Sequence, residues 1–253
     1  MSHRKPTTFN HKTFKGIDLN TKQYPLIDSN LNKIYEILKD ATRDFPRITA
    51  FRIDLRYPQD YEVDRREGVI TRFFRSLESQ LYAELKRRKS KGKSVSRECL
   101  RYIWCKEIES SKNPHFHIVI ILNKDNFRSL GDYKNFKSRR RNCKHFYHMV
   151  VDAWSRVLGI EQNEAHQAVY VPENPTYYVF DRHPFDDCIY EDDEESSFEQ
   201  MFNELFNRVV YLAKYRTRAY GTGRTFGTNR RSRQDRERQF LSELVEGSMC
   251  DQF

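Results

Sequence analysis

Residues 114–122 read Pro114-His-Phe-His-Ile-Val-Ile-Ile-Leu122, a short polar start followed by a β-branched apolar run. Such a run predicts a buried strand, and alternate side chains of a strand point to the same face. His115 and His117 are therefore expected side by side at one end of a sheet, where two imidazoles can share a divalent metal ion. A His-x-His pair also occurs on strands that bind no metal, so the interpretation depends on the surrounding sequence.

The segment before the histidines supplies candidate carboxylate ligands. Residues 98–109 predict a second strand, and Ser110 to Pro114 predict the turn that joins it antiparallel to the histidine strand. Glu107 and Glu109 share one face of that strand, so periodicity does not separate them. We favour Glu107 as the third metal ligand because it is closer to the body of the strand, and Glu109 is the alternative.

Residues 196–215 predict a long amphipathic helix that begins with a capping box. Its apolar stripe consists of Phe198, Met201, Phe202, Leu205, Val209, Leu212 and Ala213. At about 100° per residue, Tyr211, Lys214 and Tyr215 fall on the opposite side, so both tyrosines are expected to face away from the stripe. Surface tyrosines that pack on neighbouring elements are the alternative interpretation.

Together, the histidine strand, the acidic strand and the later Tyr-x-x-Lys helix resemble the HUH endonucleases. Within that superfamily the chain resembles the YagK/YfjJ group of inovirus-type replication proteins, over about residues 45–230. The motifs that carry the resemblance are Phe51-Arg-Ile-Asp-Leu-Arg-Tyr-Pro58, Arg72-Phe-Phe-Arg-Ser-Leu77, Tyr102-Ile-Trp104, Pro114-His-Phe-His117, Leu122-Asn-Lys-Asp125, Leu130-Gly-Asp-Tyr133, Pro172-Glu-Asn-Pro175, Tyr211-Leu-Ala-Lys214 and Tyr220-Gly-Thr-Gly-Arg-Thr-Phe-Gly227.

This resemblance implies an HUH/Rep-type nuclease that nicks and joins single-stranded DNA and initiates rolling-circle replication of a phage, phage satellite or integrated mobile element. It implies Mg²⁺ or Mn²⁺ bound by His115, His117 and Glu107, with a 5′-phosphotyrosine and a free 3′-hydroxyl as products. Tyr211 is the expected principal nucleophile. Lys214 is placed to favour its phenolate or to neutralise the transition state.

Tyr215 departs from the YagK/YfjJ pattern, in which a small residue usually follows the lysine. Tyr-x-x-Lys-Tyr resembles instead the A-type initiators of single-stranded DNA phages, which alternate two active tyrosines. Tyr211 and Tyr215, spaced i and i+4 on one helical face, are compatible with such a pair. We therefore include Tyr215 as a candidate second nucleophile.

The chain is basic, with 45 Lys and Arg against 36 Asp and Glu, a net charge of +9 and a pI near 9.2. This charge suits a polyanion, although many basic proteins bind none. The segment 216–238 holds eight arginines interleaved with aromatic residues, which indicates phosphate contacts and base stacking on single-stranded or origin DNA. The candidate DNA-binding residues are Arg216, Arg218, Arg224, Arg230 and Arg231. A solvated basic surface is the alternative.

The pattern predicts a polar N-terminal arm over residues 1–28, one endonuclease domain over 29–230 and a basic tail over 231–253. From residue 47 onward the expected order is β-α-β-β-α-β-α. This order favours an α+β fold with an antiparallel central sheet of about five strands. Its helices are expected against one face, which leaves the other face free for metal and DNA.

Other sequence features indicate the cellular compartment and the partners of the protein. The five cysteines form no Cys-x-x-Cys pair, which favours free thiols in a reducing cytosol, and no run has transmembrane length. The family resemblance implies that this is the cytoplasm of a bacterial host. These 253 residues contain no Gly-x-x-x-x-Gly-Lys loop, so a host helicase and polymerase are expected partners. Alternative functions are a cleavage-inactive DNA-binding regulator, a relaxase or transposase that uses the same chemistry, and a metal-dependent phosphoesterase.

Overall fold

The structure is a computed structural model of the 253-residue chain. It describes residues 6–20, 24–59, 61–62, 68–108, 113–136, 145–180, 197–215 and 223–229.

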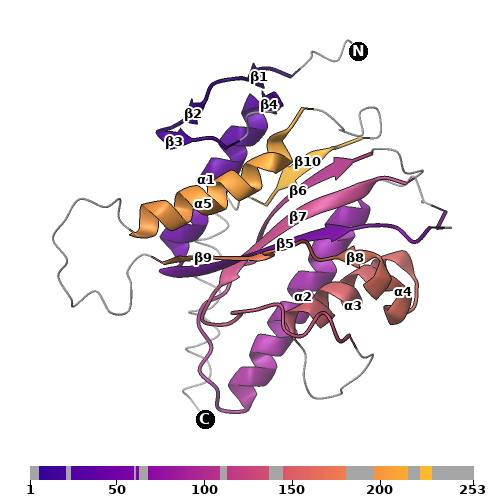
Figure 1. Cartoon of the computed structure of the whole chain (residues 1–253). Helices are drawn as coiled ribbons and strands as arrows, with labels where there is room; N and C mark the ends of the chain where they lie inside the picture. The colour runs from indigo at the N-terminus through magenta and orange to yellow at the C-terminus, as the bar shows by residue number, and fades with distance from the viewer. Residues whose placement is uncertain are drawn as a thin grey trace.

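The described residues form a six-stranded antiparallel sheet (Figure 1). Its strands are β5 (Arg47–Leu55), β6 (Arg101–Glu107), β7 (His115–Asn123), β8 (Val169–Tyr170), β9 (Thr176–Phe180) and β10 (Phe226–Thr228). The order is β10-β6-β7-β5-β8, and β9 pairs with β5 along the edge that β8 also uses. The predicted mixed α and β fold with an antiparallel central sheet is therefore confirmed.

Helix α2 (Val69–Ser90) connects β5 to β6, and β7 lies between these two strands, antiparallel to both. Phe73, Leu77 and Leu81 are buried along one side of α2, as their spacing predicts. The connection places the histidine strand at the centre of the sheet, where it is paired along both edges.

Helices cover both faces of the sheet, so the prediction that they pack on one face is wrong (Figure 1). On one face, α2, α3 (Phe146–Leu158) and α4 (Gln162–Gln167) bury side chains such as Phe51 and Ile118. On the other, α1 (Asp28–Asp44) and α5 (Ser197–Val210) bury Val119. The apolar run of β7 has no polar alternation, and a strand with that pattern requires cover on both sides.

The predicted N-terminal arm packs on the domain where the structure describes it. Short hairpin strands β1 (Thr8–Phe9), β2 (Thr13–Phe14), β3 (Ile17–Asp18) and β4 (Leu26–Ile27) run over α1 and α5. Phe14, Ile17 and Leu26 are buried there. Lys15 and Gly16, both with positive φ, form the two-residue turn between β2 and β3. Strands of two residues are too short to show the periodicity that would have predicted them.

The tyrosine helix ends earlier than predicted. Helix α5 stops at Val210, a 3₁₀ turn follows over Tyr211–Ala213, and Lys214 is extended. Lys214 forms a β-bridge with Leu26, and the N–H of Tyr215 donates to the carbonyl oxygen of Pro25 at 2.9 Å. Tyr211 and Tyr215 therefore do not share one helical face, because pairing with the N-terminal segment replaces the last helical turn.

None of the described helices is both long and apolar enough to cross a bilayer.

Candidate metal centre and tyrosine site

The strand register places the predicted ligands at one end of the sheet. His117 lies opposite Cys105 on β6 and opposite Asp54 on β5, while His115 lies opposite Glu107. Because alternate residues of a strand share a face, these side chains lie on the same face as Val119 and Ile103. Helices α1 and α5 cover that face further along the strands. The ligands thus lie on one face, just beyond the helical cover.

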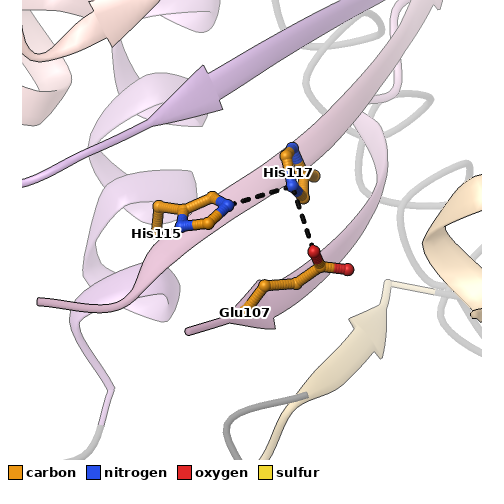
Figure 2. A group of neighbouring side chains, drawn as sticks. All are labelled: Glu107, His115 and His117. Carbon is orange, nitrogen blue, oxygen red and sulfur yellow. Dashed lines mark hydrogen bonds and ion pairs between the residues drawn. The ribbon is translucent and has the colours of Figure 1, made fainter. Parts of the chain in front are cut away.

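Glu107, His115 and His117 form a compact triad, and Figure 2 shows their side chains converging. The two histidine Nε2 atoms are 3.1 Å apart, and His117 Nε2 is 3.4 Å from Glu107 Oε2. Ligand bonds of about 2.1–2.2 Å at right angles put neighbouring donors about 3 Å apart, so the spacing fits one divalent ion. Among the described residues, this is the one group of three or more His, Cys, Asp and Glu ligand atoms within 4.8 Å of one another.

Asp54 orients His117 and was not predicted from the sequence. Its Oδ1 lies 2.7 Å from His117 Nδ1, and both side chains are buried. A proton on Nδ1 donated to this carboxylate leaves the Nε2 lone pair directed at the triad, as in many carboxylate-supported metal histidines. The donor set of two imidazoles and a carboxylate therefore fits Mn²⁺ and, less characteristically, Mg²⁺.

The charges of the triad are strongly coupled. Burial alone would raise the pKa of Glu107, but the hydrogen bond and charge of His117, together with Lys214, lower it to about 2. Burial would lower the pKa of His117, but Asp54 and Glu107 raise it above its usual value. The pKa of His115 is lowered by burial and by His117. Glu107 is thus fully buried and ionised, the state in which a carboxylate binds a cation.

Tyr211 approaches this triad from the 3₁₀ turn, and Lys214 from the extended residue that follows it. Lys214 Nζ lies 3.1 Å from Glu107 Oε2, and it also donates a short hydrogen bond to the Tyr211 hydroxyl. The ring of Tyr211 meets that of His117 edge to face, with centroids 5.5 Å apart. Burial raises the pKa of Tyr211 and Lys214 opposes the rise, so Tyr211 rests as a phenol rather than the phenolate that a nearby cation was expected to favour.

Two further residues surround Tyr211 that the sequence did not single out. The guanidinium carbon of Arg52, on β5, lies 5.3 Å from the centre of the Tyr211 ring. Tyr24, from the N-terminal segment, meets that ring edge to face at 6.0 Å. Burial raises the pKa of Tyr24, and Tyr211 adds to the rise. The segment before β4 therefore forms part of the wall of the site.

Arg224 is not brought to the triad. Its guanidinium lies 5.6 Å from the Trp104 ring, which packs on the α2 and α3 face, and its Nε donates to the carbonyl oxygen of Phe226 at 2.8 Å. The other residues predicted for ligand or DNA contact lie outside the described residues. They are Glu109, Arg216, Arg218, Arg230 and Arg231.

The antiparallel sheet and its His-x-His and glutamate cluster define a protein with a candidate divalent-metal site beside a tyrosine and a lysine. A family model described as the YagK/YfjJ C-terminal domain matches residues 9–229. The chain therefore belongs to this family, and the predicted resemblance to the YagK/YfjJ group is confirmed.

Two relatives come from Escherichia coli (strain K12). The chain is 31% identical over 205 residues to Uncharacterized protein YagK, an alignment that covers 78% of this chain and 89% of the relative. It is 27% identical over 212 residues to Uncharacterized protein YfjJ, covering 79% and 92%. No solved structure matches the chain.

Proposed function

We propose that this protein is a metal-dependent HUH-type endonuclease that nicks and rejoins single-stranded DNA through a covalent phosphotyrosine. The observation that carries the proposal is one continuous chain of contacts. Lys214 touches both the Tyr211 hydroxyl and Glu107 Oε2, and Glu107 lies beside His117. A nucleophile, a cation and three metal ligands thus occupy one site, as tyrosine attack on a phosphodiester requires.

A divalent ion bound by the triad would polarise the scissile phosphate and withdraw charge from its non-bridging oxygens. The Tyr211 oxygen then forms a bond to phosphorus, and the bond from phosphorus to the 3′-oxygen breaks. The phenol proton leaves to water through the partly exposed side of Tyr211, and the departing 3′-oxygen takes a proton from water. The products are a 5′-phosphotyrosine and a free 3′-hydroxyl, so the broken end can be rejoined by the reverse reaction.

Lys214 serves this chemistry by placing a positive charge against the reacting oxygen. Burial would lower the pKa of its ammonium, but Tyr211 and Glu107 raise it, so it is charged at neutral pH. The ammonium stabilises negative charge on the tyrosine oxygen only as that charge develops. A phenol at rest and a fixed ammonium next to it are consistent with a nucleophile that becomes active when substrate is bound.

The biological step that we favour is initiation of rolling-circle replication of a phage, phage satellite or integrated mobile element. The substrate is single-stranded or origin DNA, with a host helicase and polymerase as partners in the bacterial cytoplasm. A relaxase or transposase shares the nicking step, so replication rests on the family resemblance rather than on the geometry. Mg²⁺ and Mn²⁺ are the metals proposed.

The test is covalent attachment. The protein is incubated with Mn²⁺ and circular single-stranded DNA from its own element, and the adduct is mapped by mass spectrometry. Tyr211→Phe should abolish the adduct while DNA binding stays within about twofold, because only the hydroxyl is removed. His117→Ala should abolish metal-dependent cleavage.

Two matched controls make this test specific. Tyr24→Phe removes the hydroxyl of a ring that meets Tyr211, and Tyr215→Phe removes the hydroxyl of the other predicted nucleophile, while both leave the hydroxyl that bonds Lys214 in place. Both variants should retain the adduct. An adduct that persists in Tyr211→Phe and disappears in Tyr215→Phe would identify Tyr215 as the nucleophile. Cleavage that continues unchanged in chelator would refute the metal assignment. DNA binding by the wild type with no adduct under any metal would favour a cleavage-inactive regulator.

A further inference from the structure

Two arginines flank the orienting carboxylate on the metal-bearing face of β5. Arg52 and Asp54 alternate along this strand, and Arg56 continues the alternation just beyond its end. Each arginine lies over a tyrosine from a different part of the chain. Arg52 covers Tyr211 in the site described above, and the guanidinium carbon of Arg56 lies 4.9 Å from the ring centre of Tyr170. The second pair has no role in the proposed nicking step.

Tyr170 is among the exposed large side chains of the described residues. The side chain is 47% exposed, although its neighbour Val169 on β8 is buried in the core. Arg56 is also exposed. An aromatic ring in contact with a guanidinium, both open to solvent, offers an apolar surface and a positive charge at the same place.

The strand register fixes where this pair lies. Asp54 is opposite Tyr170 on one side and opposite His117 on the other, so the backbones of Tyr170 and His117 are two strand spacings apart, about 10 Å. Arg56 follows Leu55, which is opposite Phe116, and so continues toward His115. The Tyr170 and Arg56 pair therefore borders the metal centre on the side away from β6.

Two hydrogen bonds hold the backbone of Arg56. The N–H of Arg56 donates to the carbonyl oxygen of Ala168 at 2.8 Å. The buried indole Nε1 of Trp154 donates to the carbonyl oxygen of Arg56, also at 2.8 Å. The backbone of Arg56 is thus tied through its N–H to the residue before β8 and through its carbonyl oxygen to the core helix α3, directly after β5 ends.

We propose that Tyr170 and Arg56 form a stacking shelf, a subsite that binds one unpaired base and its phosphate next to the scissile phosphate of single-stranded DNA. This subsite rests on the proposed function, since it takes the same substrate. An exposed aromatic ring stacks on any base, and an adjacent guanidinium contacts phosphate or stacks on the base itself. A free phosphate or a small phosphoester would use the arginine but would leave the ring without a partner.

Tyr178 supplies a matched control within the same sheet. It is an exposed tyrosine on β9, which pairs with the same edge of β5, and a cation, the Nζ of Lys124, lies 4.4 Å from its ring centre. However, it lies opposite Thr49, whose side chain belongs to the other face of the sheet. Tyr178 is therefore also an exposed tyrosine beside a cation, but on the other face, and its hydroxyl donates to the carbonyl oxygen of Arg128 at 2.8 Å.

The shelf is tested by DNA binding to the full chain in chelator, where no cleavage is expected. Two fluorescent probes are compared by anisotropy, a thymidine oligonucleotide of about 20 nucleotides and an abasic oligonucleotide of the same length. Tyr170→Ala should weaken binding of the thymidine probe about tenfold and leave the abasic probe unchanged, because only the first can stack. Tyr170→Trp should restore or tighten thymidine binding, and Tyr178→Ala should change neither probe.

Arg56→Ala should weaken binding of both probes and reduce the dependence of log affinity on log salt by about one phosphate contact. Equal weakening of the two probes by Tyr170→Ala, or no weakening of either, would overturn the shelf. So would a wild type that binds neither probe. The nicking function is judged separately by the Tyr211 adduct, so a failed shelf and a failed nuclease give different results.

Discussion

Two glutamates, one at the end of β6 and one shortly before its start, lie in opposite electrostatic settings. Glu107, the last residue of the strand, is fully buried on the metal-bearing face. Burial alone would raise the pKa of Glu107, but His117 and Lys214 lower it to about 2. Its carboxylate is therefore charged at every physiological pH, inside a cluster of cationic and imidazole groups.

Glu98 lies just before the other end of the strand and is surrounded by neutral donors. Its carboxylate accepts hydrogen bonds from the backbone N–H groups of Cys99 and Asn123, each at 3.0 Å, and from the side-chain amide of Asn126 at 3.1 Å. Burial raises the pKa of Glu98 to about 7, against these hydrogen bonds. The contacts tie the start of β6 to the end of β7.

The difference shows what distinguishes a candidate site from a structural link. Both carboxyl groups are at least partly removed from water and both accept hydrogen bonds, so neither property alone identifies a metal ligand. At Glu107, cations oppose the effect of burial and keep the carboxylate ionised, whereas at Glu98 they do not. A bound ion would add to the same positive environment at Glu107.

The largest expected difference between substitutions of Glu107 and Glu98 is in metal affinity. Glu107→Gln should weaken Mn²⁺ binding by more than about 100-fold, because it removes a charged ligand rather than a supporting group. Glu98→Gln, the same change at the neutral end, should leave the affinity unchanged. Isothermal titration calorimetry measures both, and thermal unfolding in chelator shows that each variant is folded. Equal losses in the two variants would contradict the comparison.

Asp54→Asn gives a smaller effect at the same end of the sheet. The substitution keeps the size of the side chain but removes the charged acceptor of the His117 Nδ1 proton. Mn²⁺ affinity should fall about 10- to 100-fold with one ion still bound per chain, as for other residues that orient a ligand. Complete loss of binding would make Asp54 a ligand itself, and unchanged affinity would remove its orienting role.

The sequence predicts only those site residues that lie close together along the chain. His115 and His117 belong to one strand, Glu107 precedes His115 by eight residues, and Tyr211 and Lys214 are three residues apart. Asp54 is 63 residues from His117, and only the register of β5 against β7 brings them together. In the sequence, Asp54 is only a single acidic residue in an apolar strand. The ordinary alternation of polar and apolar residues along a strand accounts for such a residue equally well.

The fold was predictable where elements are long and periodic. Strands β5, β6 and β7 and helices α1, α2 and α3 follow from their apolar patterns, whereas α4 and the short edge strands β9 and β10 do not. The end of α5 depends on the bridge between Lys214 and Leu26, a contact distant in sequence that overrides local helix propensity. That bridge also joins the end of the predicted arm to the segment after α5.

The smallest expected effect concerns stability at the Glu98 end. The pKa of Glu98 rises from 4.5 to about 7 on folding, so between these values the folded chain retains a proton that the unfolded chain has released. Its contribution to the free energy of unfolding is therefore complete below about pH 4.5 and is lost as the pH rises through 7. Because the side chain is partly exposed, we expect about 2 kcal/mol rather than the full value of the shift.

Glu98→Gln should remove this pH dependence, since an amide does not titrate in that range. Urea unfolding from pH 4.5 to 8 measures how the free energy of unfolding changes with pH. Glu204→Gln, on the exposed side of α5, is the control that should retain the slope of the wild type. A slope that persists in Glu98→Gln would assign it to another group. If the difference in free energy of unfolding between the wild type and Glu98→Gln instead shifts in favour of the wild type as the pH rises, the three hydrogen bonds to Glu98 outweigh burial. Glu98 and Glu107 would then both be charged in the folded chain.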